Sequence, residues 1–475
     1  FDNISYQKGC AVLRMLENFI GEDAFRTGLR AYMQEFAEAN ATKEDLWRHL
    51  SQASGEPVED VMASWINQGG YPVIRVSLES NTLKLSQKRF FSSPDARGHG
   101  QMWHVPIVLR YEDAAGIRQR RVLLDSLEMA VPLDIEGDLK WLYANAEEIG
   151  FYRQHLDSTV MPGLLANLDK LSPLEQTGLV SDQWALTRNG TQGISGFLEV
   201  LSALTSTTHY NVLEAVVGRL HAIEDLLEDL DDTAALRKFR AWVGDRFRAQ
   251  MEEVGYEPRH ADDQNDTQRR VALVDAMSTI AEDEEAVRQA THYASREAED
   301  PASVDPNLAG LYVLSAARTG DRARFDRYVD IYKARKESGS SPQETNRYLY
   351  SLAQFRQPET IDAIYALMAD GVIPQEAVGR VLRQQFGLAH AKVAAWHYIK
   401  ANWPTIRNLG DMWTGFLVEL TGRLPSNLRG DIVAFFDANL QGVAEKPYAR
   451  ALETLDQLAE FKQRIGADLI AWFKH

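Results

Sequence analysis

The chain is poor in cysteine and in positive charge, and it has no long apolar run. Its 475 residues include one cysteine, Cys10, so no disulfide can form within the chain. Lysine and arginine number 51 against 68 aspartates and glutamates, which gives a formal net charge of −17. This balance argues against general nucleic-acid binding, which requires a basic face. No apolar run reaches the roughly 18 residues that a membrane-spanning helix needs, so the sequence predicts no membrane segment.

The remaining composition is that of a soluble globular protein. Hydrophobic residues make up 45% of the chain and charged residues 25%, and the length allows two or three domains with cores of their own. The acidic excess is compatible with cationic peptides entering an acidic vestibule, although solubility alone also accounts for it. We expect a cytoplasmic location, which a signal segment upstream of Phe1 would change.

Residues 1–70 have the apolar spacing of helices. The first predicted helix ends at Gly21 and carries one apolar stripe, on which we expect Cys10 to be buried. Thr42 predicts a later helix start, because Asp45 three residues on can complete a capping arrangement. Pro57 predicts another start. Alone, such helices would leave one apolar face uncovered.

The periodicity changes from helix to strand after residue 70. Short alternating runs, separated by turns rich in Gly, Asp, Asn and Pro, predict a small antiparallel β-sandwich over residues 71–157. The predicted strands are residues 73–78, 83–87, 105–111 and 121–124.

From residue 158 to residue 475 strand signals nearly vanish. Pro342, Pro358 and Pro374 each stand where a helix can begin. The segments between such breaks have the size of helical hairpins without a strict repeat, which indicates an irregular HEAT- or armadillo-like solenoid. We interpret the acidic run Glu224–Asp232 as a solvated helix end.

The opening segment Phe1–Leu16 resembles the FDxISYxKGAxVLRML segment of the M1 family of zinc aminopeptidases. Residues 65–73 resemble the family's WxxQxGYPV junction, residues 103–107 its W-x-VPI strand, and residues 143–157 its exit strand. The resemblance implies that Tyr6 is catalytic and that its hydroxyl donates to the oxyanion of the tetrahedral intermediate. A phenol with a pKa near 10 stays protonated at neutral pH and can play that part. Without the motif, Tyr6 would be interpreted as a residue packed at a helix start.

Other residues near the motif and elsewhere are weaker candidates. We interpret Lys8 as a local ion-pair partner and Gly9 as a site of close helix packing. His99 and His104 have a loose ligand-like spacing, but no acidic or cysteine partner follows them. Two arginines further along the chain are possible partners of a peptide carboxylate and stay outside the proposed site: Arg347 and Arg383.

The family's zinc-binding HExxH helix is missing from this sequence, because none of the 11 histidines has that spacing. The amine-binding GxMEN segment is also missing. The resemblance implies that the Zn²⁺ ligands and the general base lie upstream of Phe1. We therefore expect the C-terminal part of a zinc aminopeptidase that is inactive alone, with peptide substrates and the N-terminal catalytic portion as its partners.

The resemblance divides the chain into three segments. Residues 1–70 would be the last helices of a thermolysin-like catalytic domain, residues 71–157 a β-sandwich, and residues 158–475 a helical domain that closes the substrate chamber. The alternative is a non-catalytic peptide- or protein-binding scaffold of the same architecture. The intact SYxKG pattern around Tyr6 favours the enzyme, and an upstream HExxH would distinguish the two.

Overall fold

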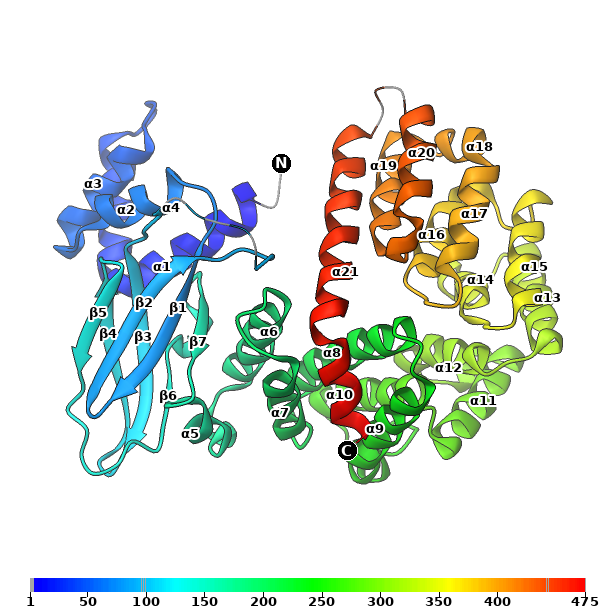
Figure 1. Cartoon of the computed structure of the whole chain (residues 1–475), viewed down its shortest axis with the longest axis horizontal. Coiled ribbons are helices and arrows are strands. Elements are labelled where there is room, and N and C mark those ends of the chain that lie inside the picture. The colour runs from blue at the N-terminus through cyan, green and yellow to red at the C-terminus, as the bar shows by residue number, and fades with distance from the viewer. Residues whose placement is uncertain are drawn as a thin grey trace. The chain divides into compact units, whose positions relative to one another are not determined.

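The computed structural model describes residues 4–94, 96, 98, 100–440, 442 and 444–474. The first three motif residues and His99 lie outside the described residues. The chain separates into two compact units, Phe1–Leu204 and Thr205–His475, which Figure 1 shows in blue to green and in green to red. The three-segment division of the chain stays a prediction.

The first unit begins with helices, as the apolar spacing predicts. A short π-helical turn, Ile4–Lys8, leads into four α-helices. The Thr42 hydroxyl and the Asp45 carboxylate form the predicted capping box, and Gly21 ends the first helix with a φ of 85°. The helices are α1 (Gly9–Ile20), α2 (Glu22–Glu35), α3 (Lys43–Ser54) and α4 (Val58–Ile66).

Cys10 is exposed, so the prediction that it is buried was wrong. Helix α1 buries the side that carries Val12, Met15 and Leu16. At 100° per residue Cys10 falls on the opposite side of the helix. Leu13 is 40% exposed, so α1 presents partly apolar surface there among the described residues.

In the part of the chain that the structure describes, seven strands form two small sheets after α4 (Figure 1). The first sheet has the order β5-β2-β1-β7 and the second has the order β4-β3-β6. The described strand pairs are antiparallel, as predicted, except β1 and β7, which are parallel. The parallel pair is possible because the intervening strands supply the long crossover that it requires. The strands are β1 (Pro72–Glu79), β2 (Thr82–Arg89), β3 (Val105–Asp113), β4 (Gly116–Leu124), β5 (Glu128–Pro132), β6 (Trp141–Tyr143) and β7 (Arg153–Leu156).

The segment expected as one exit strand from residue 143 to residue 157 is instead split in two. Strand β6 ends at Tyr143, a 3₁₀ turn covers Ala146–Glu148, and β7 follows. Glu147 and Glu148 have positive φ values of 54° and 50°, a conformation that L-residues rarely adopt. The described residues of the first unit end with the α-helices α5 (Met161–Leu165), α6 (Pro173–Arg188) and α7 (Ile194–Leu204), and a 3₁₀ turn, Leu168–Lys170, lies between α5 and α6.

The strained turn holds the Glu148 carboxyl in a protein-lined site beside α6. The Tyr143 hydroxyl is within hydrogen-bonding distance of this carboxyl, and it lies 2.9 Å from the Glu175 carbonyl oxygen. A Cβ at Gly178 would overlap the carboxyl, so glycine makes room for it. Burial, with the nearby charge of Asp182, raises the pKa of Glu148 above its ordinary value.

This raised pKa predicts a pH-dependent effect of Glu148→Gln on stability. The folded state holds the proton more tightly than the unfolded state, so ionisation destabilises the fold as pH rises above the ordinary value of about 4.3. Glutamine removes that penalty. We expect the variant to gain stability relative to the parent by at most about 1.4 kcal/mol per pH unit, measured by urea unfolding from pH 5 to pH 9. A difference that is constant across this range would contradict the prediction.

The second unit is helical, and its described residues contain no strand. Helices begin at Pro342 and Pro358, and Pro374 stands immediately before another helix, as predicted. No helix in the described part of the chain combines the length and apolarity needed to cross a membrane. The helices are α8 (Tyr210–Asp229), α9 (Thr233–Val254), α10 (Gln264–Asp275), α11 (Glu284–Glu299), α12 (Pro306–Arg318), α13 (Arg322–Ser338), α14 (Pro342–Ser351), α15 (Pro358–Ala369), α16 (Gln375–Phe386), α17 (Lys392–Ala401), α18 (Trp403–Arg407), α19 (Asp411–Leu420), α20 (Arg429–Asn439) and α21 (Glu445–Lys474).

A buried ion cluster joins α11, α13 and α14. The Glu297 side chain is fully buried, and its Oε1 lies 2.9 Å from Arg335 Nη1. Arg347 and the Tyr348 hydroxyl also donate to the Glu297 carboxylate. Arg347, considered above for a peptide carboxylate, therefore pairs with an internal one. Arg383 stacks over the Phe416 ring, with 5.3 Å between its guanidinium carbon and the ring centroid.

Candidate functional site

Tyr6 lies on the π-helical turn Ile4–Lys8, immediately before α1. Its side chain is 60% exposed, so the phenol is not part of the core of the first unit. π-Helical turns occur frequently at functional sites. The catalytic role of Tyr6 remains a prediction, and the geometry leaves the phenol accessible for it.

Lys8 attaches this turn to the junction between α4 and β1. Its Nζ donates to the Gln68 and Gly70 carbonyl oxygens, both at 3.3 Å. Burial and the charge of Arg89 lower the pKa of Lys8. The expected local ion pair is thus replaced by backbone carbonyls. The expected close packing at Gly9 is wrong as well, because no described atom lies within 4 Å of the place where its Cβ would stand.

A zinc ion does not fit any set of residues in the described ranges. Three or more histidine, cysteine, aspartate or glutamate side chains placed to hold a metal do not occur there. Catalytic zinc sites use three protein ligands. We therefore derive no chemical step through zinc from the residues of this chain.

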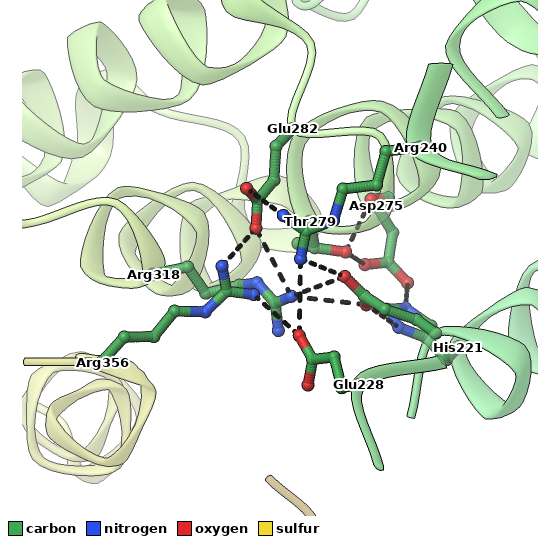
Figure 2. A network of polar contacts seen from close by, with 9 residues as sticks. His221, Glu228, Arg240, Asp275, Thr279, Glu282, Arg318 and Arg356 are labelled. Atoms are coloured by element: carbon green, nitrogen blue, oxygen red, sulfur yellow. Dashed lines mark hydrogen bonds and ion pairs between the residues drawn. The ribbon is translucent and has the colours of Figure 1, made fainter. Parts of the chain in front are cut away.

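A second group of functional side chains lines a cavity in the unit Thr205–His475. The cavity has a volume of about 450 Å³. Its wall comes from α8, α10, α12, the π-helical turn Ala276–Ile280 and the loops around Arg356 and His390. Figure 2 shows the ion-pair network in this region, where arginine and carboxylate side chains from several helices point toward one another.

Among the described residues, three arginines and three glutamates form the centre of this network, and Glu228, the third glutamate, lies 3.4 Å from Arg240. Figure 2 labels the three arginines, Glu228 and Glu282. Arg240 lies 2.9 Å from Glu224 and 2.8 Å from Glu282. Arg318 lies 3.3 Å from Glu224, and Arg356 lies 2.5 Å from Glu282. Glu282 has a φ of 49°, so a left-handed residue two positions after the π-helical turn Ala276–Ile280 supplies a carboxylate that all three arginines approach.

His221 extends the network toward α10. Its Nε2 lies 3.0 Å from Asp275 Oδ2, and its Nδ1 lies 3.9 Å from Glu224 Oε2. Burial alone would lower the pKa of His221, but the hydrogen bond and charge of Asp275 outweigh it and raise the pKa. The Thr279 hydroxyl donates to Asp275 Oδ1 at 2.6 Å, so this carboxylate is fixed from two sides.

The interpretation of Glu224–Asp232 as a solvated helix end was wrong for Glu224, whereas Asp225 and Asp231 are exposed. Glu224 is 2% exposed and is held by two arginines. The sequence did contain one usable signal, because His221, Glu224, Asp225 and Glu228 have the spacing of a single helix face. Their partners from α9, α12 and the segment after α14 are distant in sequence, so no local pattern could reveal them.

Comparisons with known proteins agree with the family motifs found at residues 1–16 and 143–157. Residues 141–457 match the family described as the ERAP1-like C-terminal domain, and residues 1–65 match the Peptidase family M1 domain. Aminopeptidase M1-A of Oryza sativa subsp. japonica is 30% identical over 444 residues, which cover 91% of this chain and 49% of the relative.

Relatives from other organisms cover the chain to a similar extent. Aminopeptidase M1 of Arabidopsis thaliana is 28% identical over 88% of this chain and 48% of its own length. Probable aminopeptidase 2 of Sulfurisphaera tokodaii is 25% identical over 96% of this chain and 54% of its own length. The chain thus spans about half the length of the curated relatives it matches. It belongs to the M1 peptidase family and carries the ERAP1-like C-terminal domain of that family.

Proposed function

We propose that this chain is the C-terminal part of a zinc aminopeptidase that removes N-terminal residues from peptides. The observation that carries the proposal is the segment around Tyr6, which lies in residues 1–65 that match the M1 peptidase domain, in a chain whose residues 141–457 match the ERAP1-like domain. The Zn²⁺ ligands and general base would be supplied by sequence outside this chain. When bound, zinc would polarise the scissile carbonyl.

The contribution of this chain to the chemistry would be one hydrogen-bond donor. The Tyr6 hydroxyl would donate to the oxygen that gains negative charge in the transition state, where one such donor is typically worth about 10²–10³ in rate. The two hydrogen bonds from Lys8 to the Gln68 and Gly70 carbonyls support the turn that carries this phenol. Lys8 would therefore act as a positioning residue and not as a substrate contact.

The helical region from residue 158 would form a HEAT- or armadillo-like superhelix that bounds the substrate chamber. Successive helices contact one another, as in the pairs α8–α9, α11–α12 and α13–α14. Such stacked helical pairs create extended binding surfaces. The region would exclude folded proteins by size and influence which peptide lengths are processed.

The test compares the full-length protein with this chain alone. We expect the full-length protein to contain one zinc per molecule and to release amino acids from aminoacyl reporters. This chain alone should do neither, since its described residues contain no ligand set. Metal analysis and reporter hydrolysis measure both properties. A full-length protein without zinc or activity would support the non-catalytic scaffold instead, and tightly held zinc in this chain alone would contradict the placement of the ligands.

A further inference from the structure

The cavity in the helical unit has the size and the wall of a ligand site. Its volume of about 450 Å³ lies in the range of about 300–1,000 Å³ that is usual for ligand pockets. Leu311, Leu314 and Leu388 provide apolar wall, and charged groups provide the rest. The π-helical turn and the left-handed Glu282 are irregularities of the kind that accumulate at functional sites.

The arginines at this cavity already have internal carboxylate partners. Arg240 contacts three glutamates, and Arg318 and Arg356 contact two each. An anionic ligand would have to displace one of these carboxylates and leave it without its partner, which is costly for the part-buried members. The arginines of this network are therefore unfavourable as a binding site for an anionic ligand.

Asp225 is the carboxyl group at the cavity that the protein does not pair. It lies one turn after His221 on α8 and lines the cavity. It has neither a hydrogen bond nor an ion pair with the described part of the chain, and its side chain is exposed to solvent. Partial desolvation in the cavity wall, followed by the charges of Glu224 and Glu228, raises the pKa of Asp225 to about 6, so the carboxylate is largely ionised at neutral pH.

His390 adds an uncharged acceptor to the same wall. Burial and the charges of Arg356 and Arg318 lower the pKa of His390 to about 4, and the ring bonds to the Phe355 backbone. Its Nε2 is buried and has no partner among the described atoms. A neutral imidazole with one nitrogen donating to a carbonyl presents the other as an acceptor. Asp225 and His390 both lack a donor.

We propose that this cavity binds the cationic side chain of an arginine or lysine residue of a peptide, with Asp225 as counter-ion and His390 Nε2 as a further acceptor. A guanidinium or ammonium group brings the donors and the positive charge that these two groups lack. The peptide as the source of the cation rests on the proposed aminopeptidase function. The cation site itself rests on the cavity.

The test uses the 475-residue chain and two blocked amino acids that differ only in charge. N-acetyl-arginine amide should bind in calorimetric titrations, and N-acetyl-citrulline amide, its neutral counterpart, should bind at least about tenfold more weakly, because hydrogen bonds to charged groups contribute about 1.5–3 kcal/mol. Equal binding of the two probes would overturn the proposal. So would the absence of arginine-probe binding at millimolar concentration, or preferential binding of N-acetylglycine, which carries only a carboxylate.

Variants of α8 locate the binding. Asp225→Asn keeps the shape of the side chain and removes its charge, and it should weaken arginine-probe binding by about tenfold or more. Glu214→Gln removes a charge from an exposed position of the same helix and should leave binding unchanged. Far-UV circular dichroism checks that both variants are folded. Equal effects of the two variants, or no effect of Asp225→Asn, would overturn the assignment. Because no hydrolysis is measured, an inactive full-length protein would overturn the proposed function and leave the cation site standing.

Discussion

Replacing Tyr6 by phenylalanine in the full-length enzyme should lower kcat by about 10²–10³-fold and leave KM nearly unchanged. The change removes one hydroxyl and keeps the ring. An interaction that is made mainly in the transition state appears in kcat and not in KM, because the ground-state complex does not use it. Steady-state kinetics on a single aminoacyl reporter measures both constants.

The matched control for this prediction is Tyr32→Phe. Tyr32 lies on α2 within the segment that matches the M1 peptidase domain, and the substitution makes the same chemical change away from the motif. We expect it to leave both constants near the parent values. If Tyr6→Phe raises KM strongly at unchanged kcat, Tyr6 binds substrate and does not stabilise the oxyanion. Zinc content should be equal in all three proteins.

The second large effect concerns the fully buried Glu297. Glu297→Gln should destabilise the helical unit by about 3–5 kcal/mol, because it leaves Arg335 and Arg347 without their carboxylate. Glutamine has almost the same shape, so the loss reports the charge and not a cavity. For a unit of this size we expect the thermal midpoint to fall by on the order of 10 °C, measured by circular dichroism at the helical minimum.

Glu299→Gln is the control for the Glu297 variant. It lies two residues later on α11, its side chain is exposed, and its loss of charge should change stability by less than about 0.5 kcal/mol. Equal midpoints for the two variants would show that Glu297 is not the anchor of this cluster. A loss in Glu297→Gln that high salt reproduces in the parent would also contradict burial of the charge, because buried pairs are screened little.

Local signals in the sequence predicted helix starts and the main strands of this fold. The capping pair Thr42 and Asp45 and the helix starts at Pro342 and Pro358 depend on neighbours within a few residues. The β6–β7 region was less predictable. Glu147 and Glu148 have positive φ values, and the sequence has no glycine at these two positions to indicate such a turn. Partners distant in the chain stabilise that turn, among them Glu175, whose carboxylate accepts from the Glu147 backbone N–H.

The candidate sites were predictable to different degrees. Tyr6 follows from a contiguous motif, and the structure adds the tether from Lys8 to the junction before β1. The cavity network could not be predicted, because its charges come from α8, α9, α12 and the loops after α10 and α14. Glu224 illustrates the difficulty. An acidic run on a helix is usually solvated, and only arginines from other helices make burial of this carboxylate favourable.

The parallel pairing of β1 with β7 has a consequence for the order in which the first unit can fold. β1 and β2 are joined by a short turn and can pair as soon as both have been synthesised. β1 can pair with β7 only later, because Val73 of β1 pairs with Arg153 of β7. Closing that long loop costs entropy before its contacts stabilise it, which makes such pairings slow to form. Until β7 arrives, the outer edge of β1 exposes unpaired backbone groups of the kind that invite aggregation. A nascent chain released before residue 156 would therefore retain an open sheet edge.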